Sequence, residues 1–381
     1  MKIQVERDIL ADAVAWTARA LPARPTVPVL AGMRLHAGTD LTLSSFDYDV
    51  SAQATVPVMA EEEGSALVSG RLLAEISRSL PARPVQIASE GGKAVLSCGS
   101  ATFTLLTMPE EEYPALPEMP PAAGSVGSDA FASAVSQSAT AAGRDDTLPA
   151  LTGVRIEIEG DTLTLISTDR YRLAVRELRW TPARPDLAAA VLVPARALAE
   201  TARSLTSGAE VSIALALPGE GGPDSGAGGD GMIGFEGGGR QTTTRLLGGE
   251  FPRYQALLPG YANATAELST PLLIEAVKRV ALVAERNTAV RLAFTPGQLV
   301  LEAGTGEEAQ AVEVLEAGYE GDDLAIAFNP QYLLDGLTAI DSDTARMSFT
   351  EPGKPALITG KPAPDGQPDY RYLLMPIRPG G

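Results

Sequence analysis

The chain has 381 residues, 45% of them hydrophobic, which is enough for two or three domains with cores of their own. A formal net charge of −18 argues against nucleic-acid binding by the surface as a whole, because phosphate contacts need lysine and arginine. A single cysteine and a single histidine exclude an intrachain disulfide and a Cys/His metal site. We find neither a signal-peptide pattern nor an apolar run of about 20 residues, so we expect a cytoplasmic protein without a membrane span or a cofactor.

The first third of the chain alternates helical and extended patterns. Helices are expected over 8–20 and 71–80, and a proline-rich exit from this segment predicts a linker at 120–124. A run of three glutamates before a glycine predicts a solvated turn at 61–64. The strands expected around these elements are 2–6, 31–37, 41–46, 49–58, 65–69, 84–89, 93–98 and 101–107.

The rest of the chain follows the same plan twice more. Residues 161–175 are typical of two strands about a tight turn, and 219–231 of a glycine-rich hairpin tip. Several strands are expected over 289–328, and the last strand over 372–378. The helices expected in these parts are 129–142, 195–206, 271–284 and 330–340.

Short phrases of sequence recur in the same order three times. A large apolar residue followed by Ala-Val three and four places later opens the segments 10–18, 131–139 and 273–281. This spacing places one apolar stripe on a helix. A second phrase links 71–80 with 196–205 and, more faintly, with 331–340. Because the copies lie roughly 120 to 140 residues apart, they predict whole domains rather than short solenoid repeats. We therefore expect an α+β protein of three tandem domains, at 1–122, 127–252 and 262–381.

Several candidate chemistries are weak. The string Gly226 to Gly231 matches a dinucleotide-binding fingerprint, but a strand rather than a helix follows it, so a flexible loop is the better interpretation. The acidic pairs 145–146, 307–308 and 322–323 lack the spacing of a calcium loop. His36 lies in an alternating strand, where an ordinary exposed or half-buried imidazole is expected. The run from Ser167 to Arg170 has no apparent base partner. The sequence therefore predicts no enzyme.

Arginines on the second helices are more informative. Arg71 and Arg78, and then Arg196 and Arg203, are seven residues apart, so each pair projects from one helix face. One such helix would be an ordinary solvated surface. Recurrence in two domains favours a cationic face, built from several helices, that attracts a polyanion in an otherwise acidic protein.

Five further motifs resemble the bacterial DNA sliding clamp, the beta subunit of replicative DNA polymerase III. They are Met-Lys-x-x-Val-Glu-Arg at 1–7, Arg-Pro-Thr-Val-Pro-Val-Leu at 24–30, Thr-Asp-x-x-Arg-Leu-Ala at 168–174, Phe-Asn-Pro-x-Tyr-Leu at 328–333 and Met-Pro-Ile-Arg at 375–378. Together with the three repeats, they extend the resemblance over essentially the whole chain.

The resemblance implies a ring. Two chains would close head to tail, with helices lining the hole and sheets outside, around double-stranded DNA held without base readout. It implies a polymerase processivity factor that is not an enzyme, with a clamp loader and the replicative polymerase as partners. The family's DNA-contacting positions, together with the basic pair of the third domain, fall on Arg24, Arg71, Arg78, Arg196, Arg203, Lys278 and Arg279. A loop at 145–150 would face the duplex, although its acidic pair does not favour phosphate.

The resemblance also implies a pocket between domains 2 and 3 for short peptides with apolar anchors. Its positions fall on Leu151, Thr168, Arg170, Tyr171, Arg172, Leu173, Pro252, Leu257, Asn329, Tyr332, Pro355, Leu373, Leu374, Met375, Pro376, Ile377 and Arg378.

The pocket positions depart from the family pattern in two places. Arg170 and Tyr171 replace a small residue and a histidine, and the chain ends Arg-Pro-Gly-Gly where a terminal leucine is usual. These departures predict an altered affinity for peptide-like ligands or inhibitors. Two alternatives stay open: a monomeric protein-binding scaffold derived from a clamp, and a specialised duplicate of the main clamp.

Overall fold

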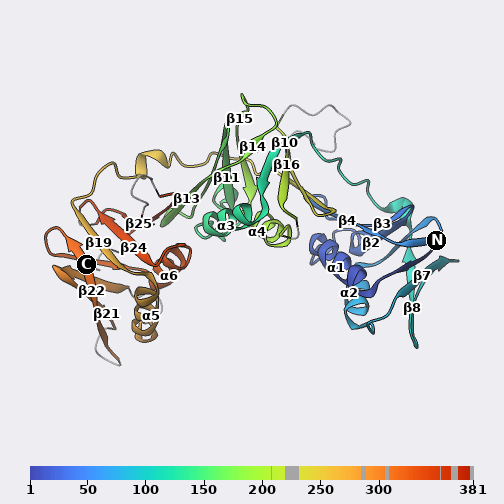
Figure 1. Cartoon of the computed structure of the whole chain (residues 1–381), viewed down its shortest axis with the longest axis horizontal. Coiled ribbons are helices and arrows are strands. Elements are labelled where there is room, and N and C mark those ends of the chain that lie inside the picture. The colour runs from blue at the N-terminus through green and yellow to red at the C-terminus, as the bar shows by residue number, and fades with distance from the viewer. Residues whose placement is uncertain are drawn as a thin grey trace. The chain divides into compact units, whose positions relative to one another are not determined.

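The computed structural model describes most of the chain and divides it into two compact units. The first unit comprises Met1–Ala132, Thr181–Leu187 and Glu200–Leu246, and the second Ser133–Trp180, Ala188–Ala199 and Leu247–Gly381. The described residues are 1–206, 208–218, 231–284, 289–304, 309–351, 353–361 and 368–377. The chain is coloured from its N-terminus to its C-terminus in Figure 1.

The first unit is built on one antiparallel sheet of 14 strands, counted over the described residues. Helices α1 (Arg7–Thr17) and α2 (Gly70–Ser79) pack against each other beside this sheet (Figure 1). In sheet order the strands are β14 (Thr181–Pro182), β10 (Ala122–Gly127), β16 (Glu210–Ala216), β17 (Met232–Gly237), β18 (Arg240–Arg245), β4 (Val50–Pro57), β3 (Asp40–Phe46), β2 (Gly32–Ala37), β6 (Gly64–Ser69), β9 (Ala101–Met108), β8 (Lys93–Cys98), β7 (Val85–Glu90), β1 (Lys2–Val5) and β5 (Met59–Glu62).

The second unit has a sheet of 12 strands within its described part. Helices α5 (Thr270–Val280) and α6 (Pro330–Thr338) pack together on it. The division between the units falls within α3 (Ser128–Ala139), after Ala132, and within α4 (Ala195–Ser204), after Ala199. In sheet order the strands are β15 (Ala188–Pro194), β11 (Gly153–Glu159), β12 (Thr162–Thr168), β13 (Arg172–Arg179), β26 (Tyr370–Leu374), β25 (Ala356–Gly360), β24 (Thr344–Phe349), β19 (Ala264–Ser269), β22 (Ala311–Glu320), β21 (Gly297–Ala303), β20 (Val290–Thr295) and β23 (Leu324–Phe328).

The repeated apolar phrase forms the buried stripe of α1, α3 and α5, as predicted. The large residue of each copy is at most 1% exposed, and the Ala-Val pair that follows is at most 2% exposed. The second phrase forms α2, α4 and α6, so all six predicted helices are confirmed. Each stripe removes one helix face from water, and this burial is the main stabilising term for a short helix. The large residues are Leu10, Phe131 and Leu273.

Three predictions about extended segments were wrong. The first two residues of the expected turn at 61–64 lie in β5, which pairs with β1, and its last residue begins β6. The expected linker at 120–124 runs into β10, which pairs with β16. Glutamate, alanine and glycine carry little strand preference of their own, so a neighbouring backbone decided both segments. The last strand ends at Leu374 rather than at 378, because Met375 and Ile377 donate their N–H groups outside the sheet ladder, to Tyr171 and Ala327.

A continuous ladder joins the first repeat to strands of the central repeat within the first unit. Strand β18 pairs with β4 over five residues, from Arg240 opposite Ala54 to Thr244 opposite Val50. Arg240 reinforces this junction: it forms an ion pair with Asp12, donates 2.9 Å to the carbonyl of Ser204 and lies 5.3 Å from the Trp16 ring centroid. Backbone hydrogen bonds between β4 and β18, together with the contacts of Arg240, therefore join the two repeats.

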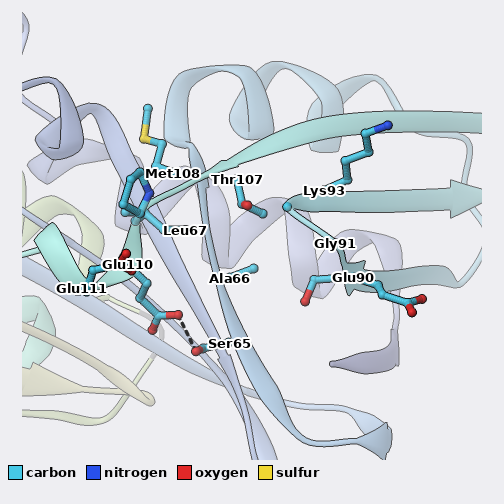
Figure 2. A pocket seen from close by; sticks show the side chains of 13 residues that line it. Ser65, Ala66, Leu67, Glu90, Gly91, Lys93, Thr107, Met108, Glu110 and Glu111 are labelled. Atoms are coloured by element: carbon cyan, nitrogen blue, oxygen red, sulfur yellow. Dashed lines mark hydrogen bonds between the residues drawn. The ribbon is translucent and has the colours of Figure 1, made fainter.

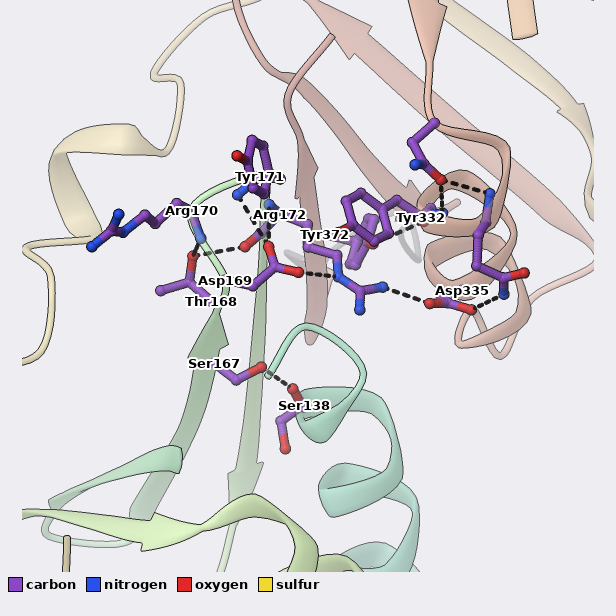
Figure 3. A network of polar contacts seen from close by, with 12 residues as sticks. Ser138, Ser167, Thr168, Asp169, Arg170, Tyr171, Arg172, Tyr332, Asp335 and Tyr372 are labelled. Carbon is purple, nitrogen blue, oxygen red and sulfur yellow. Dashed lines mark hydrogen bonds and ion pairs between the residues drawn. The ribbon is translucent and has the colours of Figure 1, made fainter. Parts of the chain in front are cut away.

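The corresponding ladder in the second unit joins β13 to β26, from Arg172 opposite Leu374 to Arg176 opposite Tyr370. Arg172 is only 6% exposed, and Figure 3 shows it between Asp169 and Asp335. Its Nε donates 2.9 Å to Asp169, and its Nη1 donates 2.5 Å to Asp335 on α6. A buried cation with two carboxylates thus ties the turn before β13 to a helix of the third repeat.

Replacing Arg172 by alanine is expected to lower the free energy of unfolding of the second unit by about 3 kcal/mol, because two poorly solvated carboxylates lose their partner. The matched control is Arg179→Ala on the same strand. Arg179 pairs with Asp161 at the surface, where both side chains are more than half exposed, so its loss should cost less than about 1 kcal/mol. Urea unfolding measures both values, and equal costs would show that Arg172 does not fasten the junction.

Candidate binding surfaces

A cavity of about 590 Å³ lies in the second unit, beside the turn between β12 and β13. Residues from this turn, from the loop that follows α3 and from α6 enclose it. The lining mixes apolar side chains with charged ones, as ligand pockets commonly do. The lining residues are Ala142, Gly143, Arg144, Asp145, Leu148, Leu151, Asp169, Arg170, Tyr171, Arg172, Gln331, Tyr332 and Asp335.

Side-chain hydrogen bonds hold the turn from Thr168 to Arg172 in one conformation. Asp169 Oδ1 accepts the backbone N–H groups of Tyr171 and Arg172, at 3.0 and 3.1 Å. Thr168 Oγ1 donates 2.7 Å to the carbonyl of Arg172 and accepts the N–H of Arg170 at 3.2 Å. As a result Arg170 has a φ of +78°, in the left-handed region that favours glycine.

Two tyrosines form an aromatic wall of the cavity. The rings of Tyr171 and Tyr332 are 6.4 Å apart, and the guanidinium of Arg172 lies 4.3 Å from the Tyr332 ring centroid. Tyr171 is 62% exposed, so its ring is available to a ligand. Behind the wall, Tyr372 donates 2.8 Å to the carbonyl of Tyr332, and burial raises the pKa of Tyr372, which keeps this phenol protonated.

Of the predicted pocket residues, Leu151, Arg170, Tyr171, Arg172 and Tyr332 line this cavity, and the others that the structure describes do not. Leu173 and Leu373 lie in a small buried cluster with Ile166, Val175 and Tyr254, and Leu374 is wholly buried in the core of the third repeat. Four of the remaining residues are exposed: Pro252, Leu257, Met375 and Ile377. Pro355 and Pro376 are half-buried. Arg378, like Pro379 beyond it, lies outside the described residues.

Asn329 has a structural role that its motif did not reveal. Its side-chain oxygen accepts the N–H groups of Gln331 and Tyr332, at 2.9 and 3.1 Å, and so caps the N-terminus of α6. This bond orients Tyr332 toward the cavity. Sequence reasoning missed Asp335, although it occupies the position of Glu75 and Glu200 in the repeated phrase, and that recurrence of an acid was the available signal.

The loop after α3 brings opposite charges to the cavity rim. Asp145 Oδ1 accepts the hydroxyl of Thr147 at 2.7 Å and its N–H at 3.0 Å, and these bonds lower the pKa of Asp145. Arg144 and Arg170 are exposed. Among the residues that the structure describes, no hydrogen bond or ion pair engages either guanidinium.

The predicted DNA-binding arginines of α2 and α4 are exposed on their helices. Arg71 donates 2.9 Å to the carbonyls of Pro22 and Ala23, which places its guanidinium beside the loop that carries Arg24. Carboxylates engage Lys278 and Arg279 on α5. Lys278 pairs with Glu275 at 2.8 Å, and Arg279 pairs with both oxygens of Glu313 on β22.

A second cavity, of about 480 Å³, lies in the first unit (Figure 2). Its carboxylate Glu110 accepts Arg34 Nε at 2.6 Å and the Ser65 hydroxyl at 2.6 Å. Glu110 therefore ties the turn after β9 to strands β2 and β6, which is a structural role.

The other candidate chemistries gain no support from the structure. His36 is exposed on β2. Residues 226–230 of the glycine-rich string and the pair 307–308 lie outside the described residues. In the described part of the chain, no three His, Cys, Asp or Glu side chains are grouped to hold a metal ion, and no helix is long and apolar enough to cross a membrane.

Models of three protein-family domains match consecutive parts of the chain. The N-terminal domain of the DNA polymerase III beta subunit matches 1–117, the central domain 125–253 and the C-terminal domain 255–378.

Similar proteins and structures point the same way. The beta sliding clamp of Streptomyces coelicolor is 61% identical over 384 residues, covering 100% of both chains. The beta sliding clamp homolog GriR of Streptomyces muensis is 44% identical over 99% of each. The crystal structure of the Bacillus subtilis sliding clamp superimposes with a TM-score of 0.90 at 26% identity over 100% of both chains. A Pseudomonas aeruginosa sliding clamp bound to griselimycin gives 0.89 at 29% identity over 99% of both.

Three tandem domain matches over nearly the whole length and a full-length identity of 61% lead to one conclusion: the chain belongs to the family of bacterial DNA polymerase III beta subunits, the beta sliding clamps.

Proposed function

We propose that the chain is a sliding clamp, a processivity factor of which two copies close head to tail around duplex DNA. It would act in the cytoplasm without catalysing a reaction, be placed on DNA by a clamp loader, and tether the replicative polymerase and other proteins. We assign its clamp domains to 1–122, 127–252 and 262–381. The proposal rests on two strand edges, one on β9 and one on β22, that have no partner strand among the described residues. The corresponding edges elsewhere in the chain pair with each other, β4 with β18 and β13 with β26.

Each domain offers the same two strands for junctions. One is the third strand of the meander after the first helix: β4, β13 and β22. The other is the last strand of the domain: β9, β18 and β26. Within the chain β4 pairs with β18, and β13 pairs with β26. By the same rule β22 requires a β9, and a second copy of the chain supplies one.

The two remaining edges have the character of an interface. Residues 101–106 of β9 pair only with β8, and 311–317 of β22 pair only with β21, among the described strands. Leu106 is 74% exposed, and Val312 and Val314 are 65% and 56% exposed. Open strand edges with exposed apolar side chains favour pairing with another chain. These features support head-to-tail association of two copies.

The arginines of α2 and α4 supply the DNA contact that we propose. A ring that slides must hold phosphates without reading bases, and arginine meets that need. The candidates are exposed basic residues, two of which, Lys278 and Arg279, also pair with carboxylates. They are Arg24, Arg71, Arg78, Arg196, Arg203, Lys278 and Arg279. The net charge of −18 would then keep DNA away from the rest of the surface.

The cavity beside the turn at 168–172 is our candidate for the partner-peptide pocket, together with the buried cluster around Leu173 and Leu373. Its aromatic wall of Tyr171 and Tyr332 suits apolar anchors, and polar groups at its rim can fix their orientation. A monomeric scaffold derived from a clamp is the alternative function, and the oligomeric state separates the two.

Changing Leu106 and Val314 to aspartate is expected to convert the dimer to a monomer, because four carboxylates would face each other across the two symmetric junctions. Analytical ultracentrifugation of both proteins measures this. Met59→Asp is the control, since Met59 is 64% exposed on a different strand and should leave the dimer intact. A native protein that sediments as a monomer would favour the scaffold.

Reversing the charge of Arg71, Arg78, Arg196 and Arg203 to glutamate is expected to abolish retention on circular DNA, since phosphates would then be repelled at the binding face. Native protein should remain on circular DNA and slide off linear DNA in a gel-filtration assay. Arg179→Glu with Arg184→Glu, two exposed residues outside the proposed face, is the matched control. Equal retention of both variants would refute the assignment of the four arginines.

The departures at the pocket rim are expected to weaken peptide binding. Restoring the family pattern with Tyr171→His and Pro379→Leu should tighten a family-consensus peptide by about threefold or more, which corresponds to roughly 0.7 kcal/mol. Fluorescence polarisation measures both affinities. An unchanged affinity would remove these two positions as determinants of peptide-like or inhibitor binding.

A further inference from the structure

We infer that Arg170 is a specificity-determining residue which selects partner peptides carrying a carboxylate beside their apolar anchors. This inference rests on the proposed peptide pocket and names the ligand chemistry that this chain prefers there.

Arg170 occupies its position against a conformational cost. Its φ of +78° lies in the left-handed region, which is strained for a residue with a Cβ and unstrained for glycine. Four hydrogen bonds made by Thr168 and Asp169 impose this conformation. Strained residues of this kind persist where the surrounding structure over-determines them, and they cluster at ligand sites.

The guanidinium of Arg170 is not used for internal structure. Figure 3 shows its side chain turned away from the cluster in which Arg172 bridges two aspartates. Asp169 accepts three hydrogen bonds, from Arg172 Nε and from two backbone N–H groups, and Arg170 contributes only its backbone to the turn. Asp145, the other acid of the rim, is held by Thr147. Among the described residues no ion pair reaches Arg170.

Arg144 adds a second unengaged cation to the same cavity. Of the six charged residues that line it, Arg172 is shared by Asp169 and Asp335 in the buried cluster, which therefore keeps one negative charge. Arg144, Arg170 and Asp145 remain at the rim, where two arginines face one aspartate. The lining as a whole is balanced, with three arginines and three aspartates, but its exposed rim carries a surplus of one positive charge beside apolar walls. The protein as a whole has a net charge of −18.

This surplus is complementary to a peptide with an acidic residue next to apolar ones. Arginine pairs with carboxylates through two parallel hydrogen bonds, and such a pair discriminates between ligands more than it adds affinity. Apart from the arginines proposed to contact DNA, the acidic surface would repel the same peptide. Apolar walls of Leu148, Leu151, Tyr171 and Tyr332 favour a peptide over the sugar-phosphate backbone of a nucleic acid.

The test uses three end-capped peptides that share Leu-Phe anchors and carry Asp, Asn or Lys on each side of them. Fluorescence polarisation on the full-length protein at about 50 mM and about 300 mM salt gives the affinities. The Asp peptide should bind about five- to tenfold more tightly than the Asn peptide at low salt, and the Lys peptide most weakly. The difference should shrink at high salt, because the rim is exposed.

Substitutions test whether Arg170 causes the preference for the Asp peptide over the Asn peptide. Arg170→Gly should reduce the ratio of the Asp-peptide affinity to the Asn-peptide affinity to within about twofold, and Arg170→Lys should retain part of the preference. Arg144→Gln should have a smaller effect. Arg184→Gln, an exposed arginine of the first unit, is the matched control and should leave the preference intact. Because Arg170→Gly relieves strain, its melting temperature should not fall, which separates loss of charge from misfolding.

Each contrary result has a distinct meaning. Equal binding of the Asp and Asn peptides to the native protein overturns the inference and leaves the pocket standing. A preference that survives in Arg170→Gly also overturns it. Failure of all three peptides to bind refutes the proposed pocket itself. A variant that weakens retention on circular DNA, with the peptide preference unchanged, assigns Arg170 to DNA and overturns the inference.

Discussion

The structure depends on pairing between sheet edges. A strand edge carries a row of unpaired N–H and carbonyl groups, and these must find partners or be protected. In each unit the edge of one repeat is satisfied by the last strand of the next, as β4 is by β18 and β13 by β26. Backbone pairing is largely indifferent to side chains, so repeats whose sequences have diverged can keep one junction geometry. Arg240 and Arg172 add side-chain fastening that is specific to each junction.

Arginine has two separate roles in this acidic protein. Arg172 and Arg240 are at least four-fifths buried at their side chains and serve as internal ties between repeats. The arginines of α2 and α4 are exposed, on helix faces opposite the buried apolar stripes. The net charge adds all acidic and basic residues together, so it does not show where on the molecule the positive charge lies. Burial distinguishes the two roles.

The ion pairs that join β13 to α6 are formed by residues that also line the cavity, Asp169, Arg172 and Asp335. The turn from Thr168 to Arg172 ends at the buried cation that ties β13 to α6, and the same hydrogen bonds hold Arg170 and Tyr171 at the cavity rim. Asn329 performs a parallel task on the other side, since it caps α6 and orients Tyr332. The junction between repeats thus also forms one side of the peptide pocket that we propose, and a rim held by hydrogen bonds would cost a ligand little to order.

Much of this protein is determined by local sequence. Helical spacing of Leu10, Phe131 and Leu273 with their Ala-Val pairs is enough to predict three buried stripes, because a period of 3.6 residues puts them on one face. Only the tertiary structure decided those features that depend on contacts between residues far apart in the sequence. Strands β5 and β10 form from segments without strand preference, since β1 and β16 offer them open edges. Asp335 became part of the cavity because folding brings α6 within 2.5 Å of an arginine 163 residues away. Local spacing specifies helices and their faces, whereas strand pairing and buried ion pairs join residues whose separation along the chain leaves no periodic signal.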